Sequence, residues 1–111
     1  MTSRDPRQFL LDILDSARLA QSYVAALTFA TFEEAVQTQD AVIRRLEIIG
    51  EAAGNLPEGV VRDIPDVPWA QVKAMRNHLV HRYWGADLQR VWIVIHDDLP
   101  PLISTIEAYL K

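Results

Sequence analysis

Three residues with reactive or charge-bearing side chains lie close together in the sequence. Arg76 is followed by His81 and then by Tyr83 in the pattern R-x4-H-x-Y. An imidazole titrates near neutrality, so it can take or give a proton as an RNA 2′-hydroxyl attacks the adjacent phosphorus. A guanidinium can bind a phosphate through two parallel hydrogen bonds and stabilise its growing negative charge. The residue types therefore suit RNA cleavage without a metal ion.

Spacing alone favours a different interpretation of these residues. They would form a solvated helix face, whose cations stabilise the C-terminal end of the same helix.

The expected helix directs the guanidinium and the imidazole differently. Each residue of an α-helix advances by about 100°, which places His81 about 140° from Arg76 around the helix axis. Arg76 and Tyr83, seven positions apart, lie on nearly the same face. One helix cannot easily bring Arg76 and His81 to one phosphate, but two copies around a two-fold axis could pool them. This geometry predicts a homodimer with a composite site.

The charge distribution supports a small positive site on an acidic chain. The 111 residues carry a formal net charge of −4, which counts against a large nucleic-acid footprint because such footprints are usually basic. No carboxylate occurs between Val67 and Ala86, although the chain contains 15 of them. That window holds Lys73, Arg76, His78, His81 and Arg82. We therefore expect one local electropositive patch.

Other polar residues have two interpretations each. Asn77 neighbours His81 on a helix because the two are four apart, and His78 is either a further phosphate contact or a surface residue. His78 and His81 have a spacing that can hold a metal, but no third ligand is evident, so no metal and no cofactor are expected. Glu51 either supports the site or dimer or, with Glu47, pairs with Arg44 along one helix face, which is the default.

Nearly every segment is predicted to be helical. Asp5-Pro6 begins a first helix, and Thr31 and Asp40 are expected to cap later ones. Apolar residues at helical spacing continue to Gly54-Asn55, where a helix should end. A connection with one turn at 58–62 leads to a helix from Pro68-Trp69 to about Trp84, stopped by Gly85. The stripes are Leu10, Ile13, Leu14, Ala17, Val24 and Leu27; then Val42, Leu46, Ile49 and Ala53; then Val72, Met75, Leu79 and Tyr83.

The last element is expected to be one long helix that Asp87 caps. Its apolar residues keep one register through Pro100-Pro101, so we predict a kink at the prolines rather than two helices. The three tryptophans, Trp69, Trp84 and Trp92, are expected to anchor the core or an interface. Together the segments predict an all-α, antiparallel bundle of four main helices in a single domain spanning residues 1–111. The register residues are Leu88, Trp92, Ile95, Leu99, Leu102, Ile106 and Leu110.

Several classes of protein are excluded by what the sequence lacks. No apolar run approaches the roughly 20 residues of a membrane helix, and the polar N-terminus carries no secretory signal. The absence of cysteine removes disulfides, thiol nucleophiles and thiolate metal sites. We expect a cytoplasmic protein with no membrane association.

The R-x4-H-x-Y pattern resembles the motif of HepT-type toxins, which belong to the HEPN superfamily (higher eukaryotes and prokaryotes nucleotide-binding). The likeness extends over essentially the whole chain. It includes Asp12-Ile-Leu14 in the first helix, Ala41 to Ala53 (AVIRRLEIIGEAA), Ile64 to Trp69 (IPDVPW), Val91-Trp92 and Asp98 to Leu102 (DLPPL).

The resemblance implies a HEPN bundle of four to five helices that dimerises and acts as a ribonuclease toxin, with RNA as substrate and tRNA as one possible target. Arg76 and His81 then become the catalytic residues, with Asn77 and His78 supporting the site. The partner implied is a small nucleotidyltransferase antitoxin of the MntA type, which attaches AMP to Tyr83. Each nucleotide would add negative charge and bulk where the substrate phosphate must bind. The motif shows no departure from the family pattern.

A second interpretation is a non-catalytic helical module that binds a nucleotidyltransferase and helps to present its substrate. The acidic net charge of −4 and the absence of an extended basic stripe favour it, because such a module needs no grip on RNA.

Overall fold

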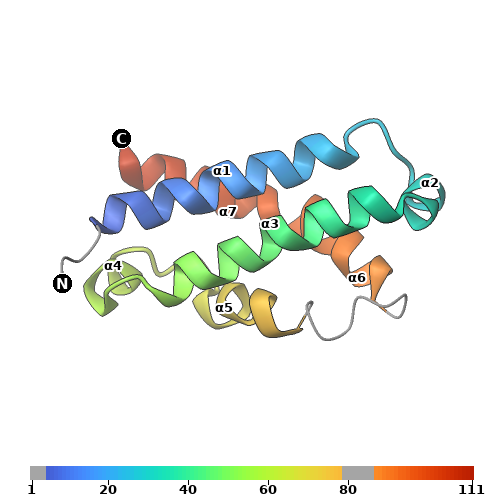
Figure 1. The fold of residues 1–111 in the computed structure, drawn as a ribbon. Coiled ribbons are helices and arrows are strands. Elements are labelled where there is room, and N and C mark those ends of the chain that lie inside the picture. Colours follow the sequence, from blue (N-terminus) through green and yellow to red (C-terminus); the bar gives the residue numbers. More distant parts are fainter. Residues whose placement is uncertain (1–4, 79–86) are drawn as a thin grey trace.

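A computed structural model describes residues 5–78 and 87–111, and within those ranges the chain is helical and has no strand. The long helices α1 and α3 lie side by side and antiparallel, with α7 and α5 packed against them (Figure 1). This confirms the predicted all-α bundle. The elements are α1 (Pro6–Val24), α2 (Phe29–Glu34), α3 (Val36–Gly54), α4 (Glu58–Asp63), α5 (Trp69–His78), α6 (Leu88–Ile93), the π-helical turn η1 (Val94–Asp98) and α7 (Leu99–Leu110).

The start of α1 follows from its local sequence. Asp5 accepts a hydrogen bond from the backbone N–H of Arg7 at 2.9 Å, and Pro6 occupies the first turn. Proline is favourable there because its missing N–H would have had no partner in the helix. The predicted start of the first helix is confirmed.

The two predicted caps between α1 and α3 are wrong. Thr28, not Thr31, caps α2, because Thr31 stands at the third helical position and its hydroxyl accepts the N–H of Thr28 at 2.9 Å. Asp40 lies inside α3, which already begins at Val36. The buried Gln39 side chain donates to the carbonyls of Phe32 and Glu33, at 2.8 and 3.0 Å, and so joins the first turn of α3 to the end of α2.

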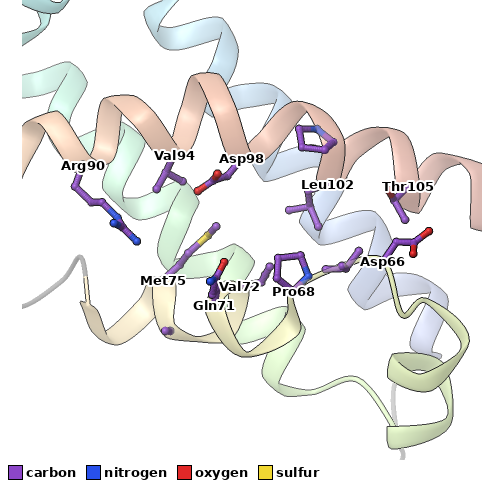
Figure 2. A pocket seen from close by; sticks show the side chains of 13 residues that line it. Asp66, Pro68, Gln71, Val72, Met75, Arg90, Val94, Asp98, Leu102 and Thr105 are labelled. Carbon is purple, nitrogen blue, oxygen red and sulfur yellow. The ribbon is translucent and has the colours of Figure 1, made fainter.

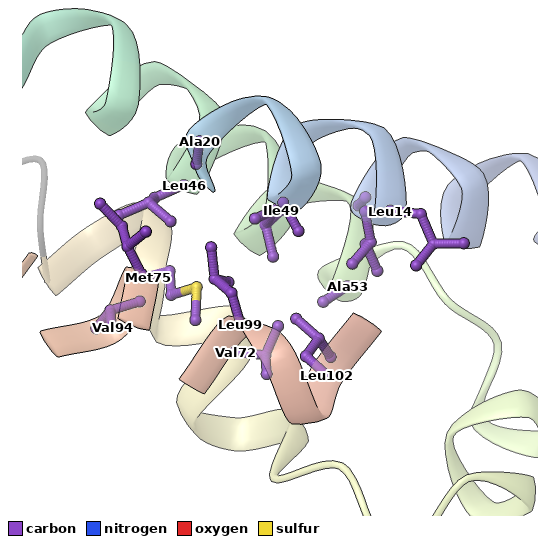
Figure 3. Close-up of a cluster of buried hydrophobic side chains, with 14 of the residues drawn as sticks. Leu14, Ala20, Leu46, Ile49, Ala53, Val72, Met75, Val94, Leu99 and Leu102 are labelled. Carbon is purple, nitrogen blue, oxygen red and sulfur yellow. The ribbon is translucent and has the colours of Figure 1, made fainter. Parts of the chain in front are cut away.

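The core lies between α1, α3, α5 and the last helical stretch. Leu46, Ile49 and Leu99 are completely buried, and Figure 3 shows Leu46, Met75, Leu99 and Leu102 converging from three helices. The predicted stripe of α3 is therefore confirmed as a core face. Removing such side chains from water supplies most of the stabilisation of a small domain.

The final stretch is continuous, as predicted, but its irregularity precedes the prolines. The N–H of Leu99 donates to the carbonyl of Val94, five residues back, which is the π-helical pattern. Pro100 has no N–H and its ring would collide with the carbonyl four residues earlier, so the turn before it widens. Pro100 and Pro101 then stand in the first turn of α7. Asp87 is at the N-cap position of α6, as predicted, but its side chain makes no capping hydrogen bond to that helix.

Two of the tryptophans are described, and both anchor the core. Trp69 is buried and its indole N–H donates to the carbonyl of Ile64 at 3.0 Å. Trp92 packs against Phe32, with ring centroids 5.3 Å apart. Trp84 lies outside the described residues. None of the described helices is long and apolar enough to cross a membrane.

Candidate active site

Helix α5 carries the described half of the predicted site. It begins at Trp69, as expected, and its apolar residues Val72 and Met75 are buried against the core. Those contacts leave the side chain of Arg76 exposed. The sequence thus places one cation of the motif at the surface because its neighbours on the helix are held in the core.

The other predicted site residues cannot be placed. Asn77 and His78 belong to α5, but their side chains are outside what the structure describes. His81 and Tyr83, together with the expected helix end at Gly85, fall in the gap between residues 78 and 87. The predicted angular separation of Arg76 and His81 therefore stays a prediction.

Arg76 lies over the C-terminal part of α3. A Cβ atom built on Gly54 would be 3.6 Å from Nη1 of Arg76, and one on Gly50 would be 2.7 Å from its backbone nitrogen. The C-terminal end of a helix carries partial negative charge, which favours a nearby guanidinium. Across residues 5–78 and 87–111, no side-chain hydrogen bond or ion pair is made by the guanidinium of Arg76. The Arg76 side chain is exposed and lies beside Gly54 at the end of α3.

Carbonyl groups at the C-terminal end of α3 accept hydrogen bonds from Asn55, the residue that follows the helix. The Asn55 side-chain amide donates to the carbonyl of Glu51 at 3.1 Å, and its backbone N–H donates to the carbonyl of Ala52. Asn55 keeps right-handed helical dihedral angles, so the helix ends where predicted but without a left-handed glycine cap. The exposed Glu51 does not pair with Arg44, nor does Glu47, so the expected pairing along this helix is wrong for these described residues.

A cavity of about 240 Å³ lies on another side of α5. Figure 2 shows it between α5 and the η1–α7 stretch, with Met75, Val72 and Leu102 in its wall. Asp66, Arg90 and Asp98 also line it. Arg76 is not part of this wall, so the cavity and the predicted phosphate-binding group are separate features.

Sequence reasoning missed one feature of the site, which is the role of Gly50. The glycine stands inside α3, between the buried Ile49 and Ala53. A glycine within an amphipathic helix costs stability relative to alanine, and it often marks a close packing contact. A glycine inside an amphipathic helix was visible in the sequence, but it does not identify which other helix packs against it.

Comparisons with known proteins agree with the motif. The model of the family described as "Ribonuclease HepT-like" matches residues 13–109. A candidate RNase of Methanocaldococcus jannaschii is 38% identical over 100% of this chain and 92% of its own length. The probable ribonuclease HepT of Thermococcus cleftensis is 36% identical over 97% of this chain and 98% of its own. No solved structure gave a significant match.

Proposed function

We propose that this chain is the toxin of a toxin–antitoxin system and that Arg76 is its phosphate-binding residue. The chain belongs to the HepT-like ribonuclease family and is an endoribonuclease. The observation that carries the proposal is the exposed guanidinium of Arg76, which has no partner among the described residues. Arg76 is the arginine of the motif, and its guanidinium lies beside the C-terminal end of α3, with Nη1 3.6 Å from a Cβ built on Gly54. An exposed guanidinium can bind a phosphate through two parallel hydrogen bonds.

The proposed reaction needs two groups besides the substrate. The imidazole of His81 takes the proton of the RNA 2′-hydroxyl as that oxygen bonds to the adjacent phosphorus and the bond to the 5′-oxygen breaks. The His81 imidazolium formed in this way then returns its proton to the leaving 5′-oxygen. Arg76 binds the phosphate oxygens and stabilises the charge that builds up on them. No metal ion is required in this scheme.

Two copies of the chain supply these groups together. A regular helix continued to residue 81 would direct Arg76 and His81 about 140° apart, so we propose a homodimer in which α5 of each copy faces a shared site. The net charge of −4 gives no strong general attraction for RNA. RNA is then bound locally, at the surface patch that contains Arg76 and the exposed Lys73.

The central test is cleavage of total tRNA by the purified protein in EDTA. We expect wild type to cleave and Arg76→Ala to lose about 10²- to 10³-fold in kcat, because one charge-stabilising donor is removed from the transition state. His81→Ala should also be inactive. Lys111→Ala is a matched control, since Lys111 is exposed at the far C-terminal end of α7. A wild type no more active than His81→Ala would contradict the proposal.

The antitoxin proposal concerns Tyr83. An MntA-type nucleotidyltransferase would join the Tyr83 oxygen to the α-phosphorus of ATP and release pyrophosphate. The added phosphodiester would repel the substrate phosphate. Mass spectrometry after co-expression should show AMP on Tyr83 and none on Tyr83→Phe. Modification found only at other residues would refute this assignment.

The second candidate function is the non-catalytic module that binds a nucleotidyltransferase. The acidic net charge of the chain favours it. Expression in cells that lack the partner separates the two functions. Toxicity of wild type that Arg76→Ala abolishes supports the ribonuclease, whereas a harmless wild type supports the module.

A further inference from the structure

Helices α3 and α5 approach each other closely at Gly50. A Cβ atom on Gly50 would be 2.7 Å from the backbone nitrogen of Arg76, 3.0 Å from its Cβ and 3.1 Å from the carbonyl oxygen of Lys73. Two of these atoms are backbone, so they cannot rotate away as the end of a side chain can. Any side chain at position 50 would therefore push the two helices apart.

The residue that meets Gly50 is the one proposed to bind the phosphate. The closest approach is to the main chain of Arg76, not to a neighbour further along α5. The guanidinium of the same residue passes over Gly54, one turn later in α3, at an ordinary contact distance of 3.6 Å from a built Cβ. Gly50 thus sets the position of the Arg76 backbone, and Gly54 leaves normal space for its side chain.

The packing around α3 and α5 determines which of the two helices would move if a side chain were added at position 50. α3 is held by Leu46, Ile49 and Ala53, all completely buried, so it has no room to yield. α5 has the cavity of about 240 Å³ on its α7 side. A methyl group at position 50 is therefore expected to move α5 and leave α3 in place.

We infer that Gly50 is a positioning residue, which places the Arg76 guanidinium for phosphate binding by admitting the backbone of α5 against α3. The inference rests on the proposed function of Arg76. A misplacement of about 1 Å can cost about a hundredfold in rate, and the overlap at Gly50 is of the size that produces such a shift.

Gly50→Ala tests this inference beside two matched glycine variants. Gly54→Ala adds a methyl at ordinary contact distance, and Gly59→Ala adds one with no atom within 4 Å. We expect kcat of Gly50→Ala to fall by about tenfold to a hundredfold with KM changed little. Gly59→Ala should keep the wild-type kcat, and Gly54→Ala, whose methyl would only touch the guanidinium at ordinary contact distance, should lose much less kcat than Gly50→Ala. A folded Gly50→Ala with wild-type kcat would overturn the inference.

A second comparison shows whether Gly50→Ala lowers kcat by displacing Arg76. In an Arg76→Lys background the fork of the guanidinium is already lost, so Gly50→Ala should reduce kcat much less than it does beside Arg76. An equal reduction in both backgrounds would overturn the inference. If Gly50→Ala does not fold in buffer alone, both proteins can be assayed in sucrose, which is excluded from the protein surface and favours the folded state; the loss of kcat relative to wild type should appear there, and equal kcat values would also overturn the inference.

Crystal structures of Gly50→Ala and Gly54→Ala provide a readout that does not depend on activity. The Cα of Arg76 should shift relative to α3 in the first variant and stay in place in the second. An inactive wild type with this shift present would end the proposed function and leave the positioning geometry intact. A Gly50→Ala structure without the shift would end the inference whatever the activity.

Discussion

The two sides of α5 are packed in opposite ways. Toward α3 the helix makes backbone contact at Gly50, with no space for a single added carbon. Toward η1 and α7 it borders a cavity of about 240 Å³ (Figure 2). Arg76 belongs to the tight side, and Val72 and Met75 take part in the loose one. The contrast indicates that the position of Arg76 is fixed by main-chain contact, which admits less adjustment than side-chain packing.

The largest expected effect comes from a bulky residue on the tight side. Gly50→Val should lower the free energy of unfolding by about 3 kcal/mol, because overpacking forces the helices apart and outweighs any gain in helix propensity. Urea denaturation monitored by circular dichroism would measure it, with Gly59→Val as the control in open space. Equal stability of Gly50→Val and wild type would remove the contrast between the two sides.

A smaller effect of opposite sign is expected on the loose side. Val72→Ile adds one methylene at the cavity wall, where burial gains up to about 0.8 kcal/mol in the free energy of unfolding. The shift of the thermal midpoint would measure it. A clear loss of stability would mean that this side is as tightly packed as the α3 side.

The smallest expected effect is a change in stability that differs in sign between alanine at position 54 and alanine at position 50. Gly54→Ala should raise the free energy of unfolding by about 0.5 kcal/mol, since alanine loses less backbone entropy on forming a helix and the methyl group has room. Urea denaturation beside Gly50→Ala would show opposite signs for the two substitutions. Destabilisation by both would indicate that the close contact extends along α3.

Local chemistry explains which parts of the fold could be predicted from the sequence. The cap at Asp5 and the end of α3 at Gly54 depend on adjacent residues, so both predictions were confirmed. The start of α3 depends on the reach of Gln39 back to Phe32 and Glu33. That contact is tertiary, and a cap pattern at Asp40 could not reveal it.

The candidate site shows the same division. The motif predicted that Arg76 lies on a helix and is accessible, because periodicity places Val72 and Met75 on its buried face. The contact with Gly50 depends on how two helices cross, and a single sequence does not contain the crossing point. The pairing predicted for Arg44 failed because exposed ion pairs stabilise a helix by only about 0.3–0.5 kcal/mol and are readily replaced by water.

The π-helical turn at Val94–Asp98 also sets the rotational phase of everything that follows it. Its wider ring accommodates one more residue than an α-turn would. If the same residues formed a regular α-helix instead, α7 would be rotated by about 100° about its axis. Leu102 and Ile106, now buried, would turn away from the core, and Leu102 would leave the wall of the cavity beside α5.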